Sequence, residues 1–423
     1  MKNLNNQPNP NELKEIENLF NSNELDVLEK KTIKLISKYP KTSILYNILG
    51  VVLQKKNNFD KAILNLKKAI NLQPNFDQAH NNLGNILKNI GKFEEAVSSY
   101  REALKINPNY AEAYSNLGNA LTEIGKIEEA IVNHQKALKL NPNHAVFYTN
   151  LGTTLVEHEK YEEAILNHKL ALKLNPKFAE AYSNLGNALT EIGKIEEAIV
   201  NHQKALKLNP QYKIANVNES IARLTLGEFE IGWKKYEARI GKNNITPMRY
   251  PIEKIWDGNY LNGILLVWAE QGLGDHIIFA SMLDDLKKYA KKIILQIDKR
   301  LENLLIRYFT KKNFSNIKIV KSEKELIFDK HIAIGSLGQY LRKSKKSFET
   351  TPKKFLIASS PKENELKKKI FENSKFKVGI SWRTLNKKQK FRNIDLEQML
   401  PILLNTNCDF INLQFGKFDE DLE

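Results

Sequence analysis

The chain has 423 residues, enough for two or three domains, and a formal net charge of +16. Its single cysteine, Cys408, excludes an internal disulfide, and its polar N-terminus and lack of a long apolar run argue against a signal peptide or membrane span, so we expect a cytoplasmic protein. The charge is +4 over residues 1–240 and +12 over 241–423, but no nucleic-acid-binding motif accompanies the basic half, and we expect no nucleic-acid partner.

A 34-residue period organises the first half of the chain. Residues 111–142 and 179–210 are identical and start 68 residues apart, which is two periods. The period recurs in three sets: Gly50, Gly84, Gly118, Gly152 and Gly186; Ala62, Ala96, Ala130, Ala164 and Ala198; and Pro40, Pro74, Pro108, Pro142, Pro176 and Pro210. Such a period predicts a stack of supersecondary units, each of which needs its neighbours to bury its apolar face.

One repeat, residues 111–144, predicts two short antiparallel helices. Apolar residues recur at helical spacing on both sides of Gly125-Lys126, and Asn141-Pro142 ends the second run. Gly118 and the small residues of the second helix are expected where the two backbones approach closely. The pattern resembles the tetratricopeptide repeat (TPR), and the resemblance implies an α-solenoid over residues 9–240 of six to seven units with degenerate ends.

An asparagine precedes most of the repeated glycines by two positions. The set is Asn82, Asn116, Asn150 and Asn184, with Asn218 in register. In a TPR stack the first helices line the concave face, so we expect solvent-facing amides outside the core that pair with the backbone of a bound protein or peptide. This row resembles the one in the TPR arm of protein O-GlcNAc transferases. The alternative is that asparagine is simply a consensus residue at this position.

Three histidines also recur at the period: His134, His168 and His202. The neighbouring repeats carry Leu66 and Tyr100 at the same position, which is a packing position of the second helix. Metal ligands must cluster, whereas equivalent positions of a solenoid lie a helix pair apart. We therefore predict packing, and no metal site.

After residue 245 the period disappears and strands alternate with helices. We expect strands at 264–268, 292–297, 317–320 and 331–334, helices at 276–290 and 299–309, then a basic helix at 362–373, a strand at 377–382, a helix near 395–404 and a strand at 408–413. Alternation of this kind predicts a parallel α/β sheet. The predicted domains are a linker at 241–260, a first half at 261–360 and a second at 361–423.

The segment 270–275 joins the first of these strands to its helix. Gly272 and Gly274 allow a sharp turn, and the helix N-terminus offers N–H groups to an anion. Asp275 stands at the carboxyl end of the strand, where open α/β sheets bind ligands, and could act as a general base. The alternative is that Asp275 only caps the helix.

Several motifs resemble a bacterial family that joins TPR repeats to a GT-B-type glycosyltransferase domain similar to ADP-heptose heptosyltransferases. They are FEIGWKKYEAR (229–239), WDG (256–258), LLVWAEQGLGDHIIFA (265–280) and KVGISWR (377–383), followed by Arg392, LEQMLPIL and INLQFG. The resemblance implies two Rossmann-like halves, metal-independent transfer from a nucleotide-sugar with no other cofactor, and Asp275 as the base. Cations and N–H groups of the second half could neutralise the diphosphate; these are Ser381, Arg383, Lys390 and Arg392. The alternative for them is a lysine-rich surface loop.

The chain departs from this family at its end. The second Rossmann-like half stops at Glu423 after one βαβ unit and lacks the family's Asp-x-(Ser/Thr) and Ala-His stretch. We therefore expect an incomplete donor site and little activity. The sequence supports a TPR-containing glycosyltransferase-like protein, or a non-catalytic TPR scaffold with a GT-B remnant. A third possibility is lipid-glycan chemistry with the repeats as an assembly platform.

Overall fold

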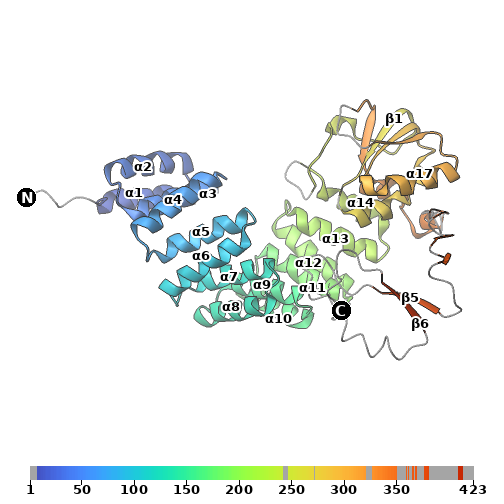
Figure 1. Ribbon diagram of the computed structural model, residues 1–423. Helices are drawn as coiled ribbons and strands as arrows, with labels where there is room; N and C mark the ends of the chain where they lie inside the picture. The colour runs from blue at the N-terminus through green and yellow to red at the C-terminus, as the bar shows by residue number, and fades with distance from the viewer. Residues whose placement is uncertain are drawn as a thin grey trace, which may run out of the picture. The chain divides into compact units, whose positions relative to one another are not determined.

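A computed structural model gives the structure of the chain (Figure 1). It describes residues 7–241, 246–270, 272–320, 326–349, 359, 361, 364–365, 367–368, 376–380 and 408–412. Contacts divide the chain into two compact units, and the boundary between them lies between Pro176 and Lys177.

The described residues of the first unit form ten α-helices in five antiparallel pairs, and each pair packs on the next (Figure 1). The helices are α1 (Pro10–Asn21), α2 (Leu25–Lys38), α3 (Ser43–Lys55), α4 (Phe59–Leu72), α5 (Asp77–Asn89), α6 (Phe93–Ile106), α7 (Ala111–Glu123), α8 (Ile127–Leu140), α9 (Ala145–Glu157) and α10 (Tyr161–Leu174). The predicted helix pairs and their 34-residue spacing are confirmed.

The turn inside each pair depends on one residue with a left-handed backbone. Gly125 adopts φ 75° between α7 and α8, and Gly91 adopts φ 78° one repeat earlier. Asn57 and Glu159 take the same conformation in their repeats, both with φ 59°. Since glycine reaches this region without steric penalty, the glycine repeats form the turn with the least strain.

Close packing between the two helices of a pair explains the repeated small residues. An ideal Cβ built on Gly118 would lie 2.6 Å from the ring of His134. An ideal Cβ on Gly152 or Gly186 would lie at the same distance from the ring of His168 or His202. Gly50 and Gly84 face Leu66 and Tyr100 in the same way. The three histidines are therefore packing residues, as predicted, and each is fully buried or nearly so.

The second unit continues with helices and then changes to strands. Its helices before the sheet are α11 (Ala179–Glu191), α12 (Ile195–Leu208), α13 (Lys213–Thr225) and α14 (Phe229–Tyr236), followed by the short 3-10 helices η1 (Glu237–Arg239) and η2 (Ile252–Lys254). These four α-helices also contact one another in sequence order, α11 with α12, α12 with α13 and α13 with α14.

A four-stranded sheet of order β3-β2-β1-β4 follows, and all three strand pairs are parallel. The strands are β1 (Leu261–Trp268), β2 (Ala290–Gln296), β3 (Ile317–Val320) and β4 (Lys330–Ala333). The connecting helices are α15 (Leu273–Ala280), α16 (Leu283–Leu286), η3 (Lys299–Leu301) and α17 (Glu302–Lys311). After β4 come η4 (Ile334–Leu337), α18 (Gly338–Leu341) and η5 (Lys345–Phe348). The prediction of a parallel α/β sheet is confirmed, and its assignment to a Rossmann-like GT-B domain stays a prediction.

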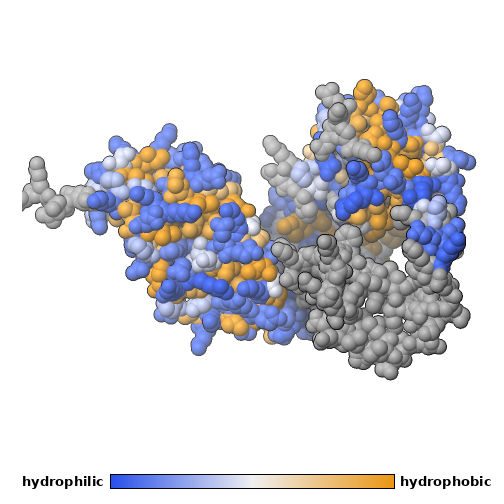
Figure 2. All heavy atoms as spheres, viewed as in Figure 1, coloured by the Kyte–Doolittle hydropathy of each residue, from blue (hydrophilic) through white to orange (hydrophobic). Residues whose placement is uncertain are grey.

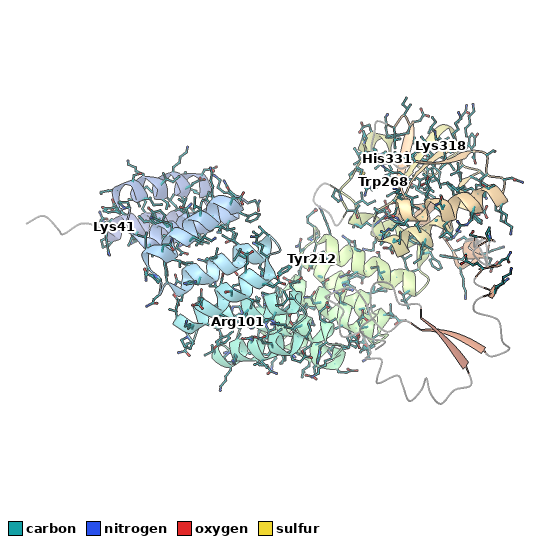
Figure 3. All side chains as sticks on the ribbon, in the orientation of Figure 1. Lys41, Arg101, Tyr212, Trp268, Lys318 and His331 are labelled. Carbon is teal, nitrogen blue, oxygen red and sulfur yellow. The ribbon has the colours of Figure 1, made fainter. Side chains whose placement is uncertain are left out.

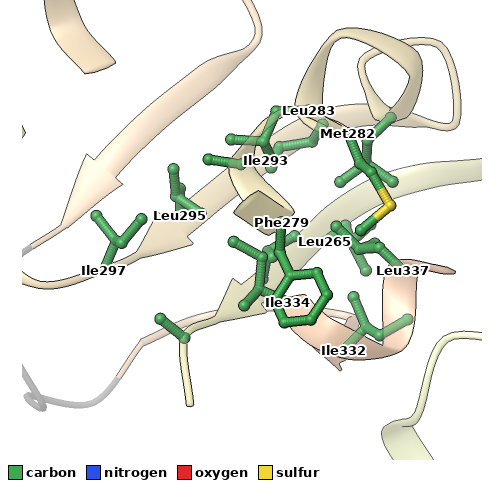
Figure 4. Packing of buried hydrophobic residues seen from close by; sticks show 14 of the residues in the cluster. Leu265, Phe279, Met282, Leu283, Ile293, Leu295, Ile297, Ile332, Ile334 and Leu337 are labelled. Carbon is green, nitrogen blue, oxygen red and sulfur yellow. The ribbon is translucent and has the colours of Figure 1, made fainter. Parts of the chain in front are cut away.

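One predicted element differs from the structure. The single helix expected at 276–290 is interrupted at Ser281 and Met282, and its end forms the start of β2. Met282 and Leu283 are buried in the core that β1 and β2 share with α15 (Figure 4). The break lets these side chains enter that core, which an uninterrupted amphipathic pattern did not predict.

A separate two-stranded parallel sheet pairs β5 (Phe376–Ile380) with β6 (Cys408–Asn412). Both strands lie where the sequence predicts them. The helix expected near 395–404 and most of the one at 362–373 lie outside the described residues.

Candidate functional site

The first helices of successive pairs form a continuous row within the first unit. α3 contacts α5, α5 contacts α7, and α7 contacts α9. The repeated asparagines occupy one position on this row: Asn82 on α5, Asn116 on α7 and Asn150 on α9. The row of first helices is the surface that a TPR solenoid presents as its groove.

Each of these asparagines is tied to the preceding repeat. The Nδ2 of Asn82 donates to Oδ1 of Asn47, and the Nδ2 of Asn116 donates to Oδ1 of Asn81, both at 3.0 Å. Asn150 donates to Oγ of Ser115 at the same distance. The asparagines are half-buried, so the expectation that they face solvent outside the core is corrected. The spacing of the asparagines cannot reveal this bond, because its acceptor lies 35 residues away.

The bond to the preceding repeat leaves each of these amides with hydrogen-bonding groups that a ligand could use. A side-chain amide has two N–H donors and one acceptor oxygen, and the bond to the previous repeat uses one donor. The bond also fixes the direction of the amide. Asn184 on α11 and Asn218 on α13 occupy the same position in the second unit and are also half-buried.

A cavity of about 370 Å³ opens on the same face of the first unit. Its lining combines donors, acceptors and one aromatic ring: Lys88, Asn89, Phe93, Asn119, Thr122, Glu123, Thr153 and Thr154. Burial lowers the pKa of Lys88, and the nearby Glu123 opposes that shift. Lys88 and Glu123 were not predicted as site residues, although each lies about two turns beyond the repeated asparagine of its own helix, Asn82 or Asn116.

The buried histidines of the helix pairs have few polar partners. Nε2 of His134 lies 3.1 Å from Oγ1 of Thr154, which in turn lies 2.9 Å from Oγ1 of Thr122. Burial lowers the pKa of His134, His168 and His202 to about 4. Within the described part of the chain, no group of three His, Cys, Asp or Glu side chains could hold a metal ion.

In the second unit, the predicted acid Asp275 lies on the first turn of α15, after the carboxyl end of β1. Its Oδ2 accepts the N–H of Gly272 at 3.1 Å, as a capping residue does. Gly272 precedes the helix and Gly274 is its second residue; both are exposed. The remaining predicted residues, Ser381, Arg383, Lys390 and Arg392, lie outside the described residues.

A buried ion pair fills the crevice at the switch point of the sheet, between the carboxyl ends of β1 and β4. Nη2 of Arg239 donates to Oε1 of Glu270 at 2.6 Å and to Oγ of Ser336 at 2.9 Å. Gly335 N–H also donates to Oε1 of Glu270, at 3.1 Å. Arg239 and Glu270 are 0% and 2% exposed, respectively. One signal for this arrangement is visible in the sequence, because Arg239 stands where the repeat pattern has an alanine.

Next to this crevice, β1 and β4 are joined by a side-chain bond. Nε1 of Trp268 donates to Nδ1 of His331 at 3.2 Å (both labelled in Figure 3), which leaves Nε2 of His331 to donate to the carbonyl of Pro251 at 2.8 Å. Both ring nitrogens of His331 thus have structural roles, and burial lowers its pKa. We assign no chemistry to it.

Comparison with protein families identifies the repeats. Models described as TPR repeat match residues 50–91, 84–125 and 152–193, and models described as tetratricopeptide repeat match 111–144, 135–166 and 179–212. Among the described residues, none of the helices has the length and apolar character needed to cross a bilayer.

Among individual proteins, the chain is similar to the protein FlbA of Caulobacter vibrioides, with 26% identity over 219 residues. That alignment covers 47% of this chain and 36% of FlbA, so the chain spans about a third of that relative's length.

Solved structures similar to the chain include the Cut9–Hcn1 complex of APC/C, MamA, and YrrB, described as a TPR protein with an unusual peptide-binding site. Cut9–Hcn1 has a TM-score of 0.48 at 20% identity, over 53% of this chain and 45% of that one. MamA has 0.35 at 29%, over 41% and 94%, and YrrB has 0.35 at 22%, over 44% and 95%.

The family matches run without interruption from residue 50 to residue 212, across the helix pairs of the structure. Together with the repeated glycine–histidine packing, they identify the region. The chain is a TPR repeat protein whose N-terminal region is an α-solenoid.

Proposed function

We propose that the chain is a cytoplasmic protein-interaction scaffold whose TPR groove holds an extended segment of a protein or peptide partner. One observation carries the proposal: half-buried amides recur at one position on successive first helices, and each is held by a bond to the repeat before it. Amides with a donor and an acceptor suit the backbone of a peptide regardless of its sequence.

The inter-repeat bonds support this proposal through pre-organisation. An asparagine side chain that is already fixed loses less rotamer freedom when it binds a ligand than a free one does. Because Asn82, Asn116 and Asn150 share the same bond and the same register, their free oxygen atoms repeat at the spacing of the helix pairs. The groove therefore offers a periodic set of fixed polar contacts.

The Asn116→Ala/Asn150→Ala variant tests the proposal. The probe is a set of peptides selected on the full chain from a randomised 12-residue display library. We expect binding of the selected peptides to weaken about 3- to 10-fold per amide, since a neutral hydrogen bond contributes about 0.5–1.5 kcal/mol. The free energy of unfolding should also fall by about 1 kcal/mol per replaced asparagine, because its bond to the previous repeat is lost.

Asn167→Ala is the matched control for that experiment. Asn167 lies on the second helix α10 and donates to the carbonyl of Glu163 in its own helix, at 2.8 Å. Peptides should bind this variant as they bind the parent chain. Equal binding to the parent and to the Asn116→Ala/Asn150→Ala variant would contradict the role of the amides.

A second candidate function is glycosyl transfer in the α/β region. The observation that favours it is a glycine turn, followed by Asp275, at the carboxyl end of the central strand β1 in a parallel sheet. This candidate takes Asp275 as the general base, Gly272 and Gly274 as an anion-binding turn, and Ser381, Arg383, Lys390 and Arg392 as the contacts of a nucleotide-sugar. It keeps the solenoid at 9–240 and the linker at 241–260, and it takes 261–360 and 361–423 as the two halves of a GT-B arrangement.

The Asp275→Asn variant tests this second candidate. An asparagine oxygen can still accept the Gly272 N–H, so the helix cap is retained while the base is lost. Transfer from nucleotide-sugars should fall 10²–10⁴-fold in this variant. Circular dichroism should show unchanged folding. Unchanged transfer would leave Asp275 as a helix cap only.

A further inference from the structure

A second cavity of the first unit is apolar. It has a volume of about 320 Å³ and lies between α1 and α3, near the N-terminal end of the solenoid. Six of its eight lining residues are hydrophobic: Leu13, Ile16, Phe20, Ile44, Ile48 and Val51. On the face of the first unit seen in Figure 2, hydrophobic residues emerge between hydrophilic ones. The volume is at the lower end of the range for ligand pockets, about 300–1,000 Å³.

This cavity is continuous with the row of asparagines. Asn47 is one of its lining residues, and the Oδ1 of Asn47 accepts the inter-repeat bond from Asn82. The cavity therefore lies on the same row of first helices as the amides, one repeat before Asn82. A peptide whose backbone lies along the amides would reach this cavity at one end.

The groove-facing side chains change from amides to aliphatic groups at the N-terminal end of the solenoid. Ile48 stands 34 residues before Asn82, and Val51 stands 34 residues before Asn85. Aliphatic side chains thus replace amides at two groove positions of a single repeat. Ile44, at the rim of the cavity, remains 41% exposed.

Charge along the groove is acidic, in a chain of net charge +16. Glu17 lines the apolar cavity, and Glu123 lines the cavity of about 370 Å³. On later first helices, Glu112 stands two periods after Ile44, and Glu157 stands one period after Glu123. The cations on these positions are Lys88 and Lys55, and Nζ of Lys55 lies 4.2 Å from the ring centroid of Phe20. Carboxylates that outnumber cations favour a basic ligand.

We infer that the cavity between α1 and α3 takes a bulky aliphatic or aromatic side chain at one end of an extended basic peptide. The backbone of that peptide lies along the asparagine row, so the inference rests on the proposed function and deepens it. The amides give affinity without sequence preference, and the cavity supplies the preference. This division matches the way in which extended peptides are recognised elsewhere, with main-chain bonds for affinity and pockets for specificity.

The library selection on the full chain provides the first test. Selected 12-residue peptides are expected to share one Leu, Ile, Phe or Met near one end and an excess of Lys and Arg. Replacing that anchor with Ala in a selected peptide should weaken binding about 10- to 100-fold, as expected when one large apolar side chain is no longer buried.

The Ile44→Asp variant tests the cavity, and Leu64→Asp is its matched control. Ile44 lines the cavity, whereas Leu64 lies on the second helix α4 and is 68% exposed. Both side chains are exposed enough for the fold to tolerate the change. Ile44→Asp should weaken binding of the anchored peptide to the level of its Ala version and leave the Ala version unaffected. Leu64→Asp should change neither.

The outcomes separate the inference from the function on which it rests. If anchored and Ala peptides bind equally, and both weaken in the Asn116→Ala/Asn150→Ala variant, the amide groove stands and the anchor cavity is overturned. If the library yields no binder, both are contradicted. If Ile44→Asp converts a dimer to a monomer in light scattering, the cavity is occupied by a second copy of the chain, and the inference is wrong.

Discussion

The free energy of unfolding is expected to fall steeply as the pH is lowered from 6.5 to 4. His134, His168 and His202 are buried against glycines, and burial lowers the pKa of each from 6.5 to about 4. The unfolded chain therefore takes up protons below pH 6.5 that the folded chain does not. The stabilisation is fully present above pH 6.5 and is lost through this window, by about 2–3 kcal/mol per histidine.

The triple variant His134→Leu/His168→Leu/His202→Leu isolates this effect. Leu66 fills the same repeat position naturally and packs against Gly50, where an ideal Cβ would lie 2.6 Å from the leucine side chain. Urea unfolding at a series of pH values, followed by far-ultraviolet circular dichroism, gives the difference between parent and variant. That difference should be small at pH 7 and should grow in favour of the variant toward pH 4. A difference that does not depend on pH would contradict the assignment.

The second large effect is expected at the ion pair of the α/β region. Arg239→Met leaves the carboxylate of Glu270 buried without its counter-ion, while the Gly335 N–H still donates to it. Breaking a buried pair from one side costs about 3–5 kcal/mol, much more than a surface pair contributes. Three of the four tryptophans, Trp233, Trp256 and Trp268, lie in the second unit, so tryptophan fluorescence in urea mainly reports its unfolding.

Two further variants show whether the loss comes from the unpaired charge. Arg239→Met/Glu270→Met removes both charges and should recover most of the stability, since apolar groups can replace a buried pair. Lys287→Met breaks a more exposed pair of the same unit, with Asp284, whose atoms are 3.3 Å apart, and should cost about 0–1 kcal/mol. Equal losses from Arg239→Met and from the double variant would show that Arg239 acts through its packing instead.

The solenoid could be predicted from the sequence because the same pattern of packing residues recurs in each repeat. Gly118 and His134 are separated by 16 residues, within one helix pair, and the pattern recurs at Gly152 with His168. Repetition therefore allowed these packing positions to be recognised from the sequence, and the structure shows that they face each other. The strands of the α/β sheet were predictable for a similar reason, since β1 and β2 are short, buried apolar runs.

Contacts between distant segments were not predictable from the same patterns. The bond from Asn82 to Asn47 joins two repeats, and the pair Arg239–Glu270 joins η1 to the end of β1. Neither contact follows from helical or strand periodicity, which describes only which face of an element is buried. The candidate site is thus partly predicted: the asparagine row was expected, whereas its anchoring bonds and the apolar cavity came from the structure.

Site-specific photo-crosslinking tests the central claim most directly. p-Benzoylphenylalanine is placed either at Asn119, which lines the groove cavity, or at Val132, which lies on the second helix α8 and is 47% exposed. The selected 12-residue peptides should crosslink to the full chain through position 119 and not through position 132. Crosslinking through position 132 alone, or equally through both positions, would contradict peptide binding along the first helices.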